Sequence, residues 1–190
     1  MAPKNPPPTY GWHFVGTTLR DGRPVPRTGR WLVHDGPLVL CASGLHFGRT
    51  PWEALQYAPG PILCRVEVGG TILDGGDKGV AQRRRIVQRM DATELLRYFA
   101  RMQALSVIHL WRADPPDVVL DYLMTGDDGI RAAARAAAWA AAEADAEADA
   151  RAAARAAAGA AVGAAACDAA SAASAADFNA LVYECFGVTA

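Results

Sequence analysis

The hydrophobic residues in the first half of the chain fall mostly into short runs that are typical of β-strands. We predict strands over residues 10–15, 31–34, 38–40, 62–68 and 80–87. Loops and turns rich in glycine and proline separate these runs, with a hairpin turn at Asp21-Gly22 and another turn at Gly75-Gly76. Strands that come first, followed by helices, predict an α+β fold with a small, mostly antiparallel (split) sheet and flanking helices.

Three segments carry the signals of a helix start. In Thr50-Pro51-Trp52-Glu53, a capping threonine, a proline at the first helical position and a glutamate form a capping box, which predicts a helix over 51–57. Asp91-Ala92-Thr93-Glu94 predicts a second helix, whose apolar residues recur at spacings of three and four up to Leu105. Asp114-Pro115-Pro116-Asp117 opens a third.

From Gly129 to Ala176 the chain is dominated by alanine, the strongest helix former. We predict a long helix or a helical hairpin, and prefer a break near Gly159 to Gly163 because an unbroken helix would be about 70 Å long. The apolar segment from Phe178 to Phe186 is expected to dock on the core or on a second copy of the chain, as a homodimer. The alternative for the alanine-rich tract is an exposed rod of low complexity.

These patterns divide the chain into a flexible, proline-rich leader (1–8), an α+β domain (9–125) and an alanine-rich helical region (126–190). The start has no apolar run, and no stretch has the large apolar residues of a membrane span, so we expect a soluble, cytoplasmic protein with no membrane contact. The net charge of -1 argues against a general nucleic-acid binder. The first 125 residues carry 15 basic and 11 acidic side chains, and the remainder carries 4 and 9, so the two parts could attract one another or bind different partners.

Candidate chemistry is concentrated in the segment from Cys41 to Tyr57, where Gly44 permits a tight turn and His46 follows it. His13 lies between two aromatic residues on a strand, so it faces away from both. If the aromatic residues fill the core, His13 points outward or into a cleft. Both histidines are therefore candidates for a functional site, whereas Tyr57 is either a core aromatic residue or a platform for stacking.

The four cysteines are widely spaced and contain no C-x-x-C pair, which disfavours a disulfide scaffold or a zinc ribbon. A mixed zinc site could combine Cys41, Cys64, His13 and His46, since tetrahedral zinc accepts two cysteines and two histidines. The spacing of Cys41 and His46 does not match a standard zinc motif, so we expect no metal.

Arginines dominate the predicted strand around residues 83–89. Alternation places Arg83 and Arg85 on one face, and Arg84 with Ile86 on the other. One interpretation is an exposed strand whose charges keep the sheet edge soluble. The other is a phosphate contact, because the guanidinium fork suits phosphate oxygens.

The spaced set C-x-x-G-L-H at 41–46, R-V-E at 65–67, Gly70 and D-K-x-V-A at 77–81 resembles an uncharacterised domain of phages and bacteria. The resemblance covers about residues 10 to 105. It implies a family, with a phage-related setting, but no activity.

A second resemblance is to the ADP-ribosyltransferases, which bind nicotinamide adenine dinucleotide (NAD) in a split antiparallel sheet. Gly11-Trp12-His13-Phe14-Val15-Gly16-Thr17 is similar to their first histidine-bearing strand, and the stretch from Gly44 through Tyr57 to the strand 62–68 is similar to their second block. This chain has His46 where that family has a tyrosine, and Ala54 where it has a serine.

The second resemblance implies roles for individual residues. His13 would hold the ribose hydroxyls, His46 or Phe47 would occupy the position of the first aromatic residue, and Tyr57 would stack on the nicotinamide. Glu67 would be the carboxylate that stabilises an oxocarbenium-like ribose. The phosphates would be held by basic residues: Lys78, Arg83 or Arg85.

Two classes of function follow as expectations. The first is an ADP-ribosyltransferase-like domain that binds NAD or a related nucleotide and transfers ADP-ribose or hydrolyses NAD, with His13, His46 and Glu67 as the catalytic residues. The second is a non-enzymatic phage or host-defence accessory protein that contacts a protein partner through residues 129–187. A third, a structural phage component, would self-assemble without a ligand.

Overall fold

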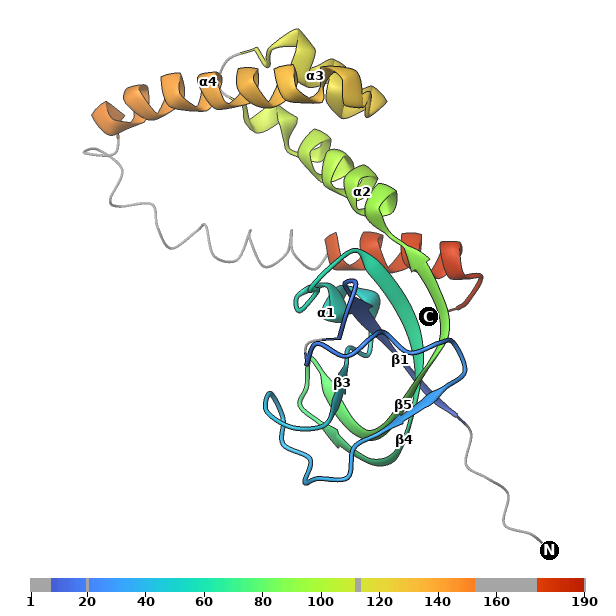
Figure 1. Ribbon diagram of the computed structural model, residues 1–190. Coiled ribbons are helices and arrows are strands. Elements are labelled where there is room, and N and C mark those ends of the chain that lie inside the picture. Colours follow the sequence, from blue (N-terminus) through green and yellow to red (C-terminus); the bar gives the residue numbers. More distant parts are fainter. Residues whose placement is uncertain (1–7, 20, 112–113, 153–173, 190) are drawn as a thin grey trace, which may run out of the picture. The chain divides into compact units, whose positions relative to one another are not determined.

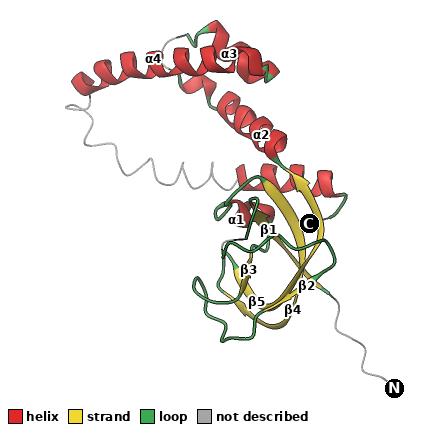
Figure 2. Ribbon diagram, in the orientation of Figure 1, coloured by secondary structure: helices red, strands yellow, loops and turns green. Residues whose placement is uncertain are grey.

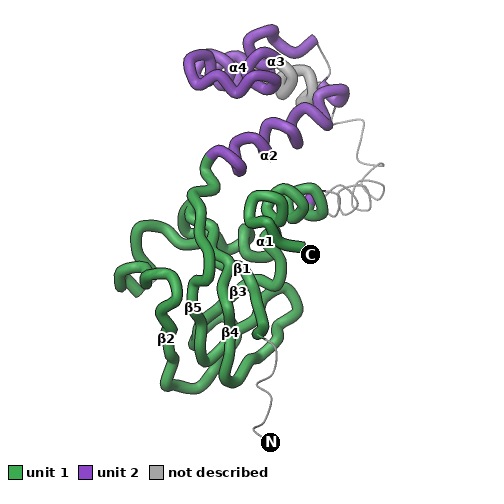
Figure 3. Tube along the Cα trace, turned by 90° about the vertical axis from the view of Figure 1, so that its right-hand side faces the viewer, with its two compact units in different colours: residues 1–93, 175–190 green, residues 94–174 purple. Residues whose placement is uncertain are grey.

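A computed structural model describes residues 8–19, 21–111, 114–152 and 174–189. The predicted leader, apart from residue 8, and the predicted break near Gly159 to Gly163 lie outside the described residues. By contacts between Cα atoms the chain forms two compact units, residues 1–93 with 175–190 and residues 94–174 (Figure 3). The domain boundary after residue 125, which rests on composition, stays a prediction.

The first unit is built on a five-stranded antiparallel sheet, as the alternating pattern predicts (Figure 2). Its strands are β1 (Thr9–Val15), β2 (Trp31–Val33), β3 (Leu45–Phe47), β4 (Ile62–Asp74) and β5 (Gly79–Asp91). The order is β1-β4-β5-β2, and β3 also pairs with β5. Both long strands extend well beyond their predicted ends, because they form one hairpin across the turn at Gly75-Gly76.

The sheet bends until its two ends meet (Figure 1). Trp12 on β1 exchanges two backbone hydrogen bonds of 2.8 Å with Gly48, directly after β3. The pairings β1-β4-β5-β3 and this bridge therefore form a closed ring. Register shifts in β4 at Arg65/Val66 and Gly69/Ile72 accompany the bend, since β-bulges increase local curvature and twist.

The inner face of the bent sheet holds a cluster of buried apolar residues: Val15, Phe47, Cys64, Val66, Val68, Ala81 and Ile86. The register between β1 and β4 pairs His13 with Cys64, so alternation turns His13 to this inner face. His13 faces away from Trp12 and Phe14, as its place between two aromatic residues predicts. The inner face is thus mostly apolar, with His13 of β1 and Arg84 of β5 among its members.

The turn before β3 differs from its prediction. Residues 38–40 were predicted to be a strand, but only Val39 makes a bridge, to Ser43, and this prediction is wrong. Cys41 adopts a φ of 65° and Gly44 a φ of 112°, both outside the extended region. A side chain on Gly44 would place its Cβ 2.4 Å from Val80, so only glycine fits there.

The helix α1 (Pro51–Leu55) begins as its capping signal predicts. Thr50 accepts a hydrogen bond from the Glu53 amide, and Glu53 accepts one from the Thr50 amide at 3.2 Å. This reciprocal capping box fixes the direction in which the chain leaves β3.

A C-terminal helix, residues 174–186, completes the first unit (Figure 1). Phe178 and Val182 are fully buried, and Phe186 packs edge to face on Trp12 with ring centres 4.9 Å apart. The Asn179 side chain also accepts a hydrogen bond of 2.8 Å from the Trp52 amide. The C-terminal helix was expected to dock either on the core or on a second copy of the chain, and in the structure it packs on the core of its own sheet unit.

The second unit is helical. It contains most of α2 (Thr93–Ser106), the short 3-10 helix η1 (Ile108–Leu110), α3 (Asp117–Thr125) and the described part of the alanine-rich tract, α4 (Asp128–Ala152). α3 and α4 pack together, with Val119, Leu123 and Ala134 buried. None of the described helices is both long and apolar enough to cross a membrane. The molecule is therefore a mixed α+β protein with a C-terminal helix, as predicted.

Candidate functional site

The first unit contains a cavity of about 860 Å³. The segments that line it are far apart in sequence: β1, the 18–23 loop, the turn before β3, β3 itself, the end of α1 with the residues after it, and two basic residues, Lys78 and Arg84. The size falls in the range of about 300–1,000 Å³ that is common for small-molecule sites. This cavity is the candidate functional site.

Five of the residues singled out from the sequence line this cavity: His13, His46, Phe47, Tyr57 and Lys78. They come from β1, from β3, from the turn after α1 and from the turn before β5. The pairing of β3 with β5 and the bridge from Trp12 to Gly48 bring these segments together.

The other three predicted site residues do not line the cavity. Arg85 donates hydrogen bonds of 2.9 Å and 2.6 Å to Glu67, so this carboxylate is held in an ion pair. The guanidinium groups of Arg83 and Arg85 lie 4.5 Å and 4.7 Å from the centre of the Trp31 ring. Glu67, Arg83, Arg85 and Trp31 therefore form a separate stacked and paired cluster on β2, β4 and β5.

His13 is neutral at physiological pH. Burial of the imidazole, followed by the positive charge of Arg84 and the proximity of His46, holds its pKa well below the usual value. A neutral imidazole offers one donor and one acceptor nitrogen. His13 can thus accept a proton or bind a hydroxyl group inside the cavity.

The orientation of His46 is set by the strained turn before it. The Cys41 amide donates a hydrogen bond of 3.0 Å to Nε2 of His46, which requires a lone pair on that nitrogen. The proton of a neutral His46 is consequently on Nδ1. The φ of 65° at Cys41, rare for a residue with a side chain, aims this amide at the ring.

Arg84 is a buried, charged lining residue that is not among the predicted site residues. Its side chain is only 6% exposed, and its Nη1 donates a hydrogen bond to the backbone carbonyl of His46. No carboxylate among the described residues forms an ion pair with it, and burial lowers its pKa to about 10. The signal was present in the alternation, which places Arg84 on the same face as the apolar Ile86.

A polar cluster lies where Tyr57 meets Lys78. Lys78 donates a hydrogen bond of 2.9 Å to the Tyr57 hydroxyl, which in turn donates to Asp77. The Tyr57 hydroxyl and the Cys41 thiol raise the pKa of Lys78, and the Tyr57 hydroxyl lowers the pKa of Asp77. The ammonium group also lies 4.2 Å from the centre of the Tyr57 ring, so one face of that ring is occupied.

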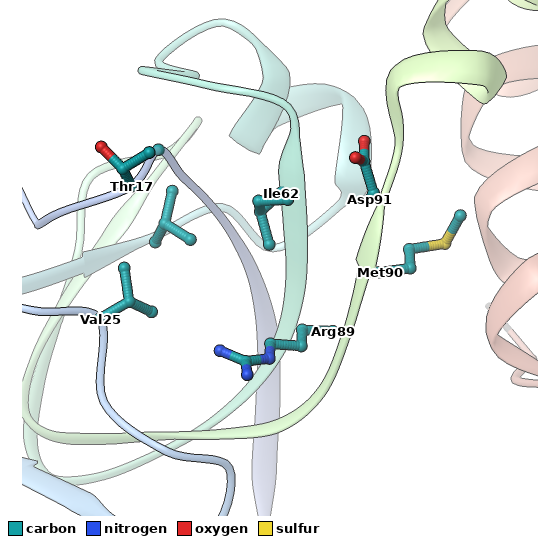
Figure 4. A pocket seen from close by; sticks show the side chains of 8 residues that line it. Thr17, Val25, Ile62, Arg89, Met90 and Asp91 are labelled. Carbon is teal, nitrogen blue, oxygen red and sulfur yellow. The ribbon is translucent and has the colours of Figure 1, made fainter.

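A second, smaller hollow of about 320 Å³ lies elsewhere in the first unit (Figure 4). Its lining includes Val25, Ile62 and Arg89, whereas the side chain of Met90 points away from the other labelled residues. Asp91 at its edge accepts two hydrogen bonds from Thr93 and so serves the start of α2. This hollow has no histidine, so it is a weaker candidate for catalysis.

Three cysteines are described, Cys41, Cys64 and Cys185, and all three are free thiols. Cys64 is buried on the inner face, and burial raises the pKa of its thiol to about 11. Within the described parts of the chain, no group of three histidines, cysteines or carboxylates is placed to hold a metal ion.

A domain of unknown function, DUF7666, covers residues 11–98. This span includes every cavity-lining residue. Its extent agrees with the predicted resemblance to an uncharacterised domain. A comparison with curated proteins finds no match to the chain, and neither does a comparison with solved structures.

Proposed function

We propose that the first unit binds NAD or a related nucleotide in the 860 Å³ cavity, in the manner of an ADP-ribosyltransferase-like domain. The observation that carries this proposal is the convergence of His13, His46, Phe47, Tyr57 and Lys78 on one cavity. His13, His46 and Tyr57 are candidates from their local setting, Phe47 and Lys78 are implied by the resemblance, and the five come from distant segments. A nucleotide needs such a mixture of polar, aromatic and cationic contacts.

The chemistry of each residue suits one part of a nucleotide. Neutral His13 offers hydrogen bonds to ribose hydroxyls, and Lys78 offers a positive charge to phosphate. Tyr57 is 53% exposed, and the face of its ring that Lys78 leaves uncovered can stack on a base.

The positions of Glu67 and Asp21 support nucleotide binding more than catalysis. Stabilising an oxocarbenium-like ribose requires a carboxylate beside the sugar, but Glu67 is bound to Arg85 outside the cavity lining. The carboxylate in the described lining is Asp21, which Arg23 holds through hydrogen bonds of 2.9 Å and 2.6 Å. NAD hydrolysis or ADP-ribosyl transfer would require one of these pairs to open.

The second candidate function is a non-enzymatic accessory protein that binds a partner through the helical unit. The observation in its favour is the exposure of large apolar side chains there, with Leu110 at 69%, Met124 at 61% and Trp139 at 67%. A phage-related or host-defence setting and a homodimer belong to this alternative. Loss of partner binding on removal of the helices would support it.

The test is calorimetric titration of the full chain with NAD and with ADP-ribose, combined with assays for nicotinamide release and for transfer of label from adenylate-labelled NAD to lysate proteins. We expect NAD binding that His13→Ala and His46→Ala each weaken at least about tenfold, or 1.4 kcal/mol. His109→Ala is the matched control, because His109 is an exposed residue outside the cavity lining. Absence of binding of both NAD and ADP-ribose by the unaltered chain would remove the proposal.

A further inference from the structure

We propose that Arg84 is the anchor for an anionic group of the ligand, so that the cavity selects phosphorylated compounds over their uncharged counterparts. The inference rests on the proposed function only in taking this cavity as the ligand site. It does not depend on whether the ligand is NAD.

The guanidinium charge of Arg84 is buried. Arg84 is 6% exposed, and no other charged residue in the described part of the first unit is buried. Removing a guanidinium from water carries a large desolvation cost, which proteins normally offset with a counter-ion. A buried arginine at a cavity wall with no counter-ion is the arrangement expected when the ligand supplies the negative charge.

The carboxylates of the segments around the cavity already have other partners. Glu67, on the strand next to Arg84, is bound by Arg85 at 2.6 Å. Asp21 in the cavity lining is bound by Arg23, also at 2.6 Å. Asp77 accepts from Tyr57 and lies 4.0 Å from Lys78. These pairings leave Arg84 without an acidic partner in the described part of the chain.

The guanidinium of Arg84 is oriented by a hydrogen bond to β3. Its Nη1 donates to the carbonyl of His46, which anchors one side of the group to β3. This is the one hydrogen bond that the structure gives to the Arg84 side chain among the described residues. The planar fork of an arginine can bind two oxygens of a phosphate at once, so the remaining N–H groups suit an oxyanion.

The surrounding cavity favours an anion as well. Lys78 adds a second positive charge, and its pKa is raised, so it stays protonated. His13 stays neutral, because burial and then the positive charge of Arg84 lower the pKa of its imidazole. The lining therefore holds three cations: Arg23 is paired with Asp21, Lys78 lies 4.0 Å from the carboxylate of Asp77, and Arg84 is in no ion pair among the described residues.

The experiment compares three probes that carry phosphate with one that does not: NAD, ADP-ribose, inorganic pyrophosphate and adenosine. Each is titrated into the full chain and into the Arg84→Met, Arg84→Lys and Arg83→Met variants. Arg83→Met is the matched control, since Arg83 precedes Arg84 in the strand but is exposed, stacks on Trp31 and does not line the cavity.

We expect Arg84→Met to weaken binding of the phosphorylated probes about 100-fold, and Arg84→Lys to weaken it about tenfold because lysine keeps the charge but loses the fork. Arg83→Met should leave binding unchanged. In the absence of any anion, the melting temperature of Arg84→Met should equal or exceed that of the unaltered chain, because an uncompensated buried charge is removed.

Two results would overturn the inference. One is unchanged affinity of Arg84→Met for pyrophosphate and ADP-ribose. The other is a clear fall in the melting temperature, or failure to fold, of Arg84→Met, since Arg84 would then be a structural residue.

The outcomes also separate this inference from the proposed function. Arg84-dependent binding of pyrophosphate without binding of NAD or ADP-ribose would support the anchor and remove the nucleotide proposal. NAD binding that is indifferent to Arg84 would do the reverse. No binding of any phosphorylated probe would overturn both.

Discussion

At the scale of single residues, neighbouring charges determine what each side chain in the cavity can do. Arg84 and His13 share the inner face of the bent sheet, and the guanidinium helps to keep the imidazole neutral. Arg85, the next residue along the strand, faces the other way and neutralises Glu67. Adjacent arginines thus differ in role, because alternation sends one into the cavity and the other to the outer cluster.

The lowered pKa of His13 predicts a stability that depends on pH. Histidine in an unfolded chain titrates near pH 6.5, whereas His13 in the folded chain accepts its proton only at lower pH. The unfolded state therefore binds more protons as the pH falls below about 6.5, and the folded state loses up to about 1.4 kcal/mol per pH unit. The contribution is fully present above that pH.

Chemical denaturation at pH 7.5 and 5.5 measures this dependence. The difference in the free energy of unfolding between pH 7.5 and pH 5.5 should shrink in His13→Gln. It should persist in His109→Gln, because His109 is exposed and does not line the cavity. An unchanged difference in His13→Gln would mean that His13 is not the titrating group.

At the scale of elements, the sheet unit depends on a helix from the far end of the chain. The C-terminal helix (174–186) covers Trp12 and Trp52 with its own aromatic residues, and Phe178 lies 5.9 Å from the Trp52 ring. Trp12 also carries the bridge to Gly48 that closes the ring of strands. The helix is therefore part of the structure that holds the cavity in shape.

Replacing Phe178 by alanine should lower the free energy of unfolding by about 3–5 kcal/mol, because a fully buried aromatic side chain is lost. Glu184→Ala, at an exposed position of the same helix, should change it by less than about 0.5 kcal/mol. Urea unfolding followed by tryptophan fluorescence measures both. Equal, small effects would show that the helix does not stabilise the sheet.

At the scale of the whole molecule, charge and candidate chemistry belong to the same unit. The first unit has 12 basic and 9 acidic side chains, and residues 94–174 have 7 and 11. A net positive unit that contains the cavity attracts anionic ligands. No residue that the structure describes in the helical unit lines the cavity.

Replacing residues 94–174 with a long glycine-serine linker should therefore leave the first unit folded and its affinity for phosphorylated probes within about twofold, a difference of roughly 0.4 kcal/mol. Circular dichroism and calorimetric titration of the shortened chain provide the measurement. Loss of binding by a folded shortened chain would mean that the helical unit shapes the site. Binding of a cellular partner lost on the same deletion would support the accessory function.

Local signals determined much of the fold. Three signals act over only a few residues: the capping box at Thr50, the turn at Gly75-Gly76 and the alternation along residues 62–68. The sequence alone therefore predicted α1 and the hairpin formed by β4 and β5. The predicted strand at 38–40 is wrong, because a short apolar run becomes a strand only if it pairs with another strand. Here the chain turns at Cys41 instead.

The composition of the cavity was decided by tertiary structure. His13 and His46 were recognisable as candidates from their local setting, but their meeting depends on the closed ring of strands, which is a long-range pairing. The register between β4 and β5 likewise places Glu67 beside Arg85, which binds it. Arg84 has no carboxylate partner among the described residues. Short-range pattern thus determined which elements form, whereas register and burial, which depend on contacts between distant segments, decided which charges are paired and which one faces the cavity.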